Sequence, residues 1–247
     1  MQRMHLPRPA RRSARAANAA WPAIIFGFAL AACSDSPFEP VDSAITPAAA
    51  LNPSAPSEPF DGFNVTTWMK QEHLLGRGWL LASNVTVEAS QLRLALEADR
   101  SEGGEIASRT SFGTGTFAAR LRCGAPAGAL CAFFLYQPNV GARADEIDIE
   151  ILGGTREIWF TTWQRARRTN HVARELPFDP AQSAHEYAIV RAGATVAFYV
   201  DGEEYARFRR KVPTSRMALL VNAWWPTWLT PAAGSTGSLD LDWIDWS

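Results

Sequence analysis

The sequence predicts an all-β fold, an antiparallel sandwich or barrel built from many short strands. Apolar residues alternate or run together over strand-like lengths at 91–96, 116–121, 195–200 and 239–246. Turn-forming pairs such as Asp201-Gly202 separate these segments, and no long stretch keeps a helical period with caps. Short strands at regular spacing are typical of a sandwich or barrel rather than of a mixed fold.

The N-terminal region has the pattern of an export signal. Five arginines lie within the first 15 residues, the apolar run Ile24–Ala32 follows, and no acidic residue comes before Cys33. The run is shorter than the roughly 20 residues of a membrane-spanning helix, so a signal peptide over 1–32 is expected. Leu30-Ala31-Ala32-Cys33 resembles a bacterial lipobox, which implies a lipid anchor on Cys33. With Ser34 next, the resemblance implies an exported cell-envelope lipoprotein of the outer membrane.

A change in composition divides the mature chain into a tether and one domain. Residues 33–57 are rich in Pro, Ala and Ser and cannot bury enough apolar surface to fold. Residues 58–247 are long enough for a single domain with a sizeable core, which we expect to be monomeric. The net charge is −1 and no basic stripe alternates with aromatics, so we expect no nucleic-acid partner. Arg165, Arg167 and Arg168 are interpreted as a solvated loop, because no glycine-rich turn accompanies them.

Two further cysteines, Cys123 and Cys131, flank a segment with the composition of a loop between strands. Export permits a disulfide, provided that the two Cα atoms lie close enough. The alternative is a pair of reduced, buried thiols. We favour the disulfide, and these cysteines show no metal-ligand spacing.

Acidic residues and isoleucines alternate from Glu146 to Ile151. On a strand, Glu146, Asp148 and Glu150 share one face while the isoleucines share the other. Three carboxylates in a row repel each other, which raises the proton affinity of at least one and couples their titrations. Retaining glycoside hydrolysis needs an ionised and a protonated carboxyl roughly 5–5.5 Å apart. Residues i and i+4 of a flat strand are roughly 13 Å apart, so the two glutamates must lean together on a curved sheet.

Two other interpretations of this motif stay open at the level of the residues alone. Alternating acidic and β-branched residues also occur on a solvated strand face. Carboxylates in a row can hold calcium, although the glycine and loop spacing of an EF-hand is absent.

Residues 145–153 closely resemble the active-site strand of glycoside hydrolase family 16, in its lichenase and xyloglucan-transglycosylase branches. Those branches lack the extra residue that laminarinase-like members carry before the last glutamate, and so does this chain. Segments 58–61, 112–115, 199–202 and 222–224 also resemble family motifs, so nearly the whole folded part is covered. The resemblance implies a concanavalin-like β-jelly roll with a glycan-binding cleft across its concave sheet.

The resemblance also implies roles for individual residues. Glu146 is expected to be the nucleophile, Glu150 the general acid and then base, and Asp148 the residue that holds and tunes the nucleophile. Residues expected to bind the glycan are Glu105, Trp163, Asn222, Trp224 and Trp228. This agrees with sugar chemistry, because apolar C–H faces pack on aromatic rings while hydroxyls need fixed polar partners.

The function expected is a retaining endo-β-glucanase, with mixed-linkage β-1,3-1,4-glucan as the favoured polysaccharide. Two positions depart from the family pattern: Ala107 stands where lichenases carry an arginine, and Phe160–Trp163 stands where the family has an Asn-Tyr-containing strand. The polysaccharides β-1,3-glucan, xyloglucan and a galactan therefore remain alternative substrates. Transglycosylation remains an alternative reaction. A non-catalytic lectin-like module is the alternative of another class; the presence of both glutamates argues against it. No cofactor is required. A structural calcium at Pro59 and Asp242 remains an option, although Ser90 replaces the family's glycine.

Overall fold

A computed structural model of the chain describes residues 56–138, 144–231 and 233–247. The expected signal peptide, Cys33 and nearly all of the tether lie outside the described residues. Within the described part, no helix is long and apolar enough to cross a membrane. The described strands run from Trp68 at the start of β1 to Trp246 at the end of β16.

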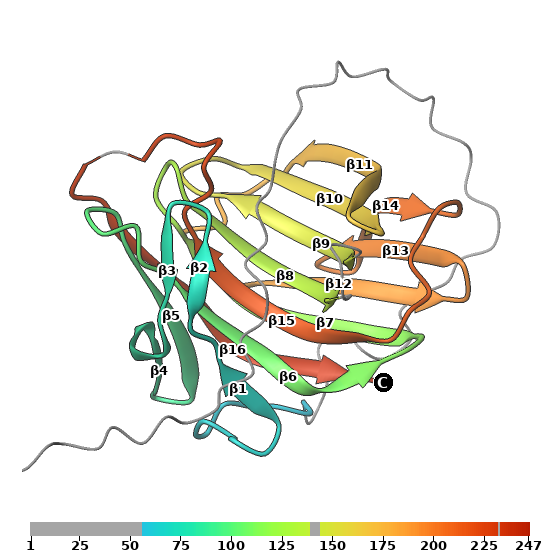
Figure 1. Cartoon of the computed structure of the whole chain (residues 1–247), viewed down its shortest axis with the longest axis horizontal. Helices are drawn as coiled ribbons and strands as arrows, with labels where there is room; N and C mark the ends of the chain where they lie inside the picture. Colours follow the sequence, from blue (N-terminus) through green and yellow to red (C-terminus); the bar gives the residue numbers. More distant parts are fainter. Residues whose placement is uncertain (1–55, 139–143, 232) are drawn as a thin grey trace, which may run out of the picture.

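Two seven-stranded antiparallel sheets form the fold (Figure 1). The first sheet consists, in spatial order, of β1 (Trp68–Lys70), β6 (Gly104–Phe112), β15 (Met217–Trp224), β8 (Leu130–Gln137), β9 (Asp145–Leu152), β10 (Glu157–Gln164) and β11 (Arg167–Glu175). The second consists of β14 (Glu203–Phe208), β13 (Thr195–Val200), β12 (His185–Ala192), β7 (Gly115–Gly124), β16 (Thr236–Trp246), β5 (Gln91–Glu97) and β4 (Val85–Glu88). A small hairpin of β2 (His73–Leu75) and β3 (Gly78–Leu80) precedes a 3-10 helix at Ala82–Asn84.

The core lies between the two sheets and is built by strands that alternate in polarity. On β9, Ile147, Ile149 and Ile151 are almost completely buried, so the strand is anchored by the face opposite its carboxylates. The strands expected at 91–96, 116–121, 195–200 and 239–246 all form, as parts of β5, β7, β13 and β16. The prediction of an all-β antiparallel jelly-roll sandwich is confirmed.

A disulfide joins Cys123 of β7 to Cys131 of β8, with Cα atoms 5.9 Å apart. Because β7 and β8 belong to different sheets, the bond connects the two layers of the sandwich rather than two paired strands. The separation lies in the usual range for disulfides. This bond is the pairing that the sequence analysis favoured.

The outer face of the first sheet carries a second apolar cluster. It includes Leu80, Ala107, Phe134, Leu220 and Trp224, all buried. These side chains are not part of the core between the sheets, yet they surround a hollow on that face. The apolar cluster therefore forms the floor on which the polar residues of the site are set.

Candidate active site

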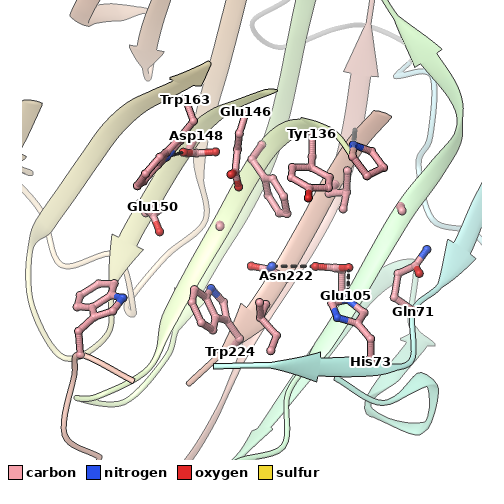
Figure 2. A pocket seen from close by; sticks show the side chains of 17 residues that line it. Gln71, His73, Glu105, Tyr136, Glu146, Asp148, Glu150, Trp163, Asn222 and Trp224 are labelled. Carbon is pink, nitrogen blue, oxygen red and sulfur yellow. Dashed lines mark hydrogen bonds and ion pairs between the residues drawn. The ribbon is translucent and has the colours of Figure 1, made fainter. Parts of the chain in front are cut away.

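Strand β9 places its three carboxyl groups in the hollow on the outer face of the first sheet (Figure 2). Asp148 is buried, whereas Glu146 and Glu150 on either side of it are partly exposed. The flanking isoleucines Ile147 and Ile149 point into the core. The alternation expected from the sequence thus delivers all three acids to one face, and the interpretation as a fully solvated strand face is wrong.

Asp148 is held by a neighbour on the adjacent strand. Trp163 of β10 donates its indole N–H to Asp148 Oδ2 at 2.9 Å. The carboxyl of Asp148 also hydrogen-bonds to Glu146, an interaction that raises the pKa of Asp148 and lowers that of Glu146. A protonated Asp148 favours the ionised form of Glu146 beside it.

Burial raises the pKa of all three carboxyls, because desolvation penalises their charged forms. For Glu146, burial and the charge of Glu150 raise the pKa to about 8, against the opposing hydrogen bond from Asp148. For Glu150, burial raises the pKa to about 7, and the positive charge of Arg168 opposes that rise. The hydrogen bonds distinguish them: of the two glutamates, Glu146 accepts from Asp148.

A second polar group lies across the floor, on β6 and β15. Glu105 is buried, and its two carboxylate oxygens accept from His73 Nε2 at 3.0 Å and from Asn222 Nδ2 at 2.9 Å. Burial lowers the pKa of His73, but the hydrogen bond and charge of Glu105 outweigh it and leave that pKa raised. The Oδ1 atom of Asn222 is buried without a protein partner, so it is available to accept a hydrogen bond from a ligand hydroxyl.

Aromatic side chains complete the hollow, which opens to solvent. Tyr136, Trp163, Trp224 and Trp228 line it. Trp228 stacks on Trp159 with ring centroids 5.0 Å apart and planes inclined by 16°. Aromatic faces beside fixed hydrogen-bonding groups suit the two-sided character of a sugar ring.

The structure brings every expected glycan-binding residue to this hollow. Glu105, Trp163, Asn222, Trp224 and Trp228 all line it, together with the three acids. The structure adds one detail for Trp163, whose indole nitrogen is engaged by Asp148.

Sequence reasoning missed His73, Gln71, Tyr136 and Trp159. Trp159 could have been found, because it lies four residues before Trp163 and a period of two puts both on one face of a strand. Tyr136 carries no such signal, because β8 is apolar and buried over nearly its whole length. Nothing local marks His73 or Gln71, because they reach the hollow from the hairpin region before β6.

The fold and the site together define a class of protein. An antiparallel sandwich carries a partly shielded row of carboxyls with raised pKa on one face, flanked by aromatic walls. Burial favours the protonated forms of these carboxyls, and one of them, Glu146, has a neighbour whose hydrogen bond opposes that rise. This combination of groups is that of a glycosidase.

Comparison with known proteins agrees. The model of the family glycosyl hydrolases family 16 matches residues 79–245. A β-glucanase of Bacillus subtilis (strain 168) is 28% identical over 203 residues, covering 76% of this chain and 84% of that protein. The solved structure of Bacillus licheniformis β-glucanase has a TM-score of 0.72 and 25% identity, covering 77% of this chain and 96% of that chain. A prokaryotic β-1,3-1,4-glucanase (lichenase) from a mouse hindgut metagenome has a TM-score of 0.71 and 26% identity, covering 77% and 97%.

The chain belongs to glycosyl hydrolase family 16. It is an endo-acting glycosidase.

The residues at the expected calcium position do not suit a cation. Asp242 Oδ1 accepts from Gln91 at 2.8 Å, and Asp242 Oδ2 accepts from the guanidinium of Arg120 at 3.1 Å. Both oxygens therefore face N–H donors, one of them charged, where calcium needs free oxygen ligands. We infer that Pro59 and Asp242 do not form a calcium site.

Chelation tests this inference. We expect the melting temperature in excess EDTA to equal that in added CaCl₂ within about 1 °C, because a site filled to about 100 times its Kd would stabilise by about 2.7 kcal/mol and shift it by several degrees. A calcium-dependent rise of that size, measured by scanning calorimetry, would show that a site exists. MgCl₂ at the same ionic strength is the control.

The buried carboxyl of Asp148 also predicts a stability change. Its folded-state pKa is raised, so its contribution to stability is greatest below the ordinary carboxyl pKa of about 4 and is lost as pH rises. Asp148→Asn removes this loss and retains an oxygen that can accept from Trp163. We expect the variant to melt a few degrees higher than the parent at about pH 8 and at nearly the same temperature at about pH 4. A gain independent of pH would contradict the assignment of a raised pKa.

Proposed function

We propose that this glycosidase cleaves a β-glucan with retention of configuration and that mixed-linkage β-1,3-1,4-glucan is its favoured substrate. The linkage is supported by the names of its relatives, which include β-glucanases and a β-1,3-1,4-glucanase. We further propose that catalysis requires no cofactor, since the side chains of the hollow supply an acid, a base and a nucleophile.

The observation that carries the retaining mechanism is the unequal hydrogen bonding of the two glutamates. Glu146 accepts from the Asp148 carboxyl, which Trp163 holds in place. Glu150 lacks that donor, so no neighbouring carboxyl favours its ionised form, and burial favours its protonated form. An ionised nucleophile and a protonated acid facing one hollow are what a double displacement needs.

In the first step, a carboxylate oxygen of Glu146 attacks the anomeric carbon while the glycosidic C–O bond breaks. The proton of Glu150 moves to the departing oxygen, which leaves as the hydroxyl of the released chain. In the second step, Glu150 takes a proton from water, the water oxygen attacks the anomeric carbon, and the bond to Glu146 breaks. Two inversions at one carbon give net retention.

A substrate panel tests the proposal. The domain from residue 58 onward, which contains both sheets and the hollow, is incubated with barley β-glucan, lichenan, laminarin, xyloglucan and agarose. Reducing-end release identifies the substrate, and NMR of early products identifies the anomer formed first. We expect rapid release from the mixed-linkage glucans, with the β-anomer appearing first.

Other outcomes would redirect the proposal. An α-anomer formed first would exclude the retaining mechanism. Release from laminarin, xyloglucan or agarose alone would replace the favoured substrate. Chain-length redistribution without net release of reducing ends would indicate a transglycosylase, and binding without either reaction would indicate a lectin-like module.

We also propose that residues 1–32 are a signal peptide, that 33–57 is a tether and that Cys33 carries a lipid in the outer membrane. The support is the arginine-rich start, the short apolar run and the lipobox-like tetrad. Cys33→Ala is expected to move the full-length protein from the membrane fraction of cells to the soluble fraction. Immunoblotting of the two fractions measures this change. Continued membrane association of the variant would contradict lipidation at this residue.

A further inference from the structure

Five cationic side chains gather at the β11 end of the first sheet, and we call them the basic rim. They are Arg165, Arg167, Arg168, Arg210 and Lys211, all exposed. Three belong to the β10–β11 hairpin and two to the segment between β14 and β15. The net charge of the chain is only −1, so this concentration does not reflect a generally basic protein.

A β-bulge turns Arg168 toward the hollow. In the register of β10 with β11, Thr162 pairs with Asn170 and Trp163 pairs with Arg168, so Thr169 is the extra residue. A regular ladder would have placed Thr169 opposite Trp163. Bulges re-aim side chains, and residues paired across strands share a face. Arg168 therefore lies on the same face as Trp163, which lines the hollow and pairs on its other side with Glu146.

The turn at the tip of the same hairpin holds an arginine where Asn or Gly is usually found. Arg165 and Ala166 have φ angles of 53° and 58°, so both occupy the left-handed region in a two-residue turn. Asn and Gly are preferred in such turns because they tolerate this conformation at lower cost. Arg165 therefore does not stabilise the turn, and its presence there is not explained by local folding.

The second part of the basic rim is fastened to the hairpin. Asn170 Nδ2 donates to the carbonyl oxygen of Arg210 at 3.0 Å. Gln164 Nε2 donates to the carbonyl oxygen of Val212 at 3.2 Å. The two segments also meet at Asp145, whose carboxylate accepts from the backbone N–H of Arg165 at 2.9 Å and from Ser215 Oγ at 2.7 Å. Asp145 directly precedes Glu146, so the basic rim is tied to the catalytic strand.

No carboxylate neutralises these charges among the residues that the structure describes. None of the five lies within 4.0 Å of an acidic side chain, whereas Arg120, Arg122 and Arg207 elsewhere are all ion-paired. Asp145, at which the two segments meet, uses its two oxygens for neutral donors. Unpaired guanidinium groups beside a binding hollow attract anions, and their planar fork matches carboxylate and sulfate oxygens.

We propose that the basic rim binds an anionic group carried by the glycan, a carboxylate or a sulfate ester, where the chain leaves the hollow over β11. The inference rests on the proposed function and adds to it a preference for β-glucan chains that carry acidic substituents over the same chains without them. Arg168 is close enough to act on the reaction centre, since its charge also lowers the pKa of Glu150. Arg167 pairs with Gln164 and lies on the opposite face of the sheet from Arg168, so it and the other three cations contribute only a longer-range positive field around that point.

The test compares one β-glucan backbone in three forms: unmodified, partly oxidised to carboxylates at C6, and partly sulfated. The quantity measured is kcat/KM for each anionic form divided by kcat/KM for the neutral form. Arg168→Gln is expected to lower this ratio about tenfold, because one charge-assisted contact is lost. The triple variant Arg165→Gln/Arg167→Gln/Arg168→Gln is expected to lower the ratio further. Rising salt should lower the parent's ratio and leave the triple variant's ratio almost constant. Whichever anionic form shows the larger effect identifies the group.

Arg174→Gln is the matched control. Arg174 is an exposed arginine on the same strand, but it pairs with Ile158 on the opposite face. Its ratio should equal that of the parent. A change in the pKa of Glu150 in the Arg168 variant would affect all three forms alike and cancel in the ratio.

An anionic-to-neutral ratio that is the same in the parent, the Arg168 variant and the triple variant would overturn the proposal. If no form is cleaved, the proposed function fails separately, and affinity electrophoresis in gels with neutral or anionic glucan still tests the basic rim. Retardation by anionic glucan that the triple variant loses would support it. Equal retardation of both proteins would overturn it, as would rim-dependent binding to anionic lipid vesicles without binding to anionic glucan.

Discussion

Glu146→Ala is expected to lower kcat on soluble β-glucan by at least about 10⁴-fold, since loss of a covalent nucleophile removes the double displacement itself. Glu146 faces the hollow and accepts from Asp148, so no other described carboxyl has the same environment. Initial rates of reducing-end release measure the loss. Folding should be retained, because the residue is partly exposed and its removal relieves repulsion with Glu150.

The control for this variant is Glu88→Ala, which truncates an exposed glutamate on β4 of the other sheet. It should retain the activity of the parent. Oligosaccharide binding by the Glu146 variant, measured by calorimetry, should also remain, because the aromatic walls and the Glu105–Asn222 pair are unchanged. More than about one per cent residual activity would rule out Glu146 as the nucleophile.

Glu150→Ala is expected to lower kcat/KM on the polysaccharide by about 10² to 10⁴-fold, the range for a general acid. The loss has a specific signature. A substrate whose leaving group needs no protonation, such as a nitrophenyl β-glucan oligosaccharide, should still form the covalent intermediate with Glu146. A burst of nitrophenolate followed by slow turnover is therefore expected in stopped-flow measurements.

Added azide separates the two glutamates further. In the Glu150 variant, azide should replace the activated water, restore turnover of the nitrophenyl substrate and give a β-glycosyl azide. In the Glu146 variant, direct attack by azide would give the α-product instead. If Glu150→Ala yields the α-azide and Glu146→Ala the β-azide, the two roles are the reverse of those proposed.

The alternation on β9 was enough to predict that its three carboxyls share one face of a strand, while their catalytic role came from the resemblance to glycoside hydrolase family 16. A period of two assigns Glu146, Asp148 and Glu150 to one face and buries the isoleucines on the other, whatever the rest of the chain does. The tight turns and short strands likewise predict an antiparallel sandwich. These features depend on neighbours along the chain, so they can be derived from sequence.

Features that depend on contacts between distant segments required the tertiary structure. Trp163 reaches Asp148 only because β10 pairs with β9 in one register. His73 meets Glu105 because the β2–β3 hairpin packs beside β6, 32 residues further along. The disulfide joins two sheets although its cysteines are only 8 residues apart.

The basic rim shows the same division most clearly. The three arginines of the hairpin are visible in the sequence and are exposed as expected, but the prediction of a loop is wrong for Arg167 and Arg168, which belong to strand β11. Their relation to the hollow depends on a one-residue bulge and on the β14–β15 segment, which is about 40 residues away in the chain. A shift of one residue exchanges the two faces of a strand, so local pattern alone could not decide which side chain faces the substrate.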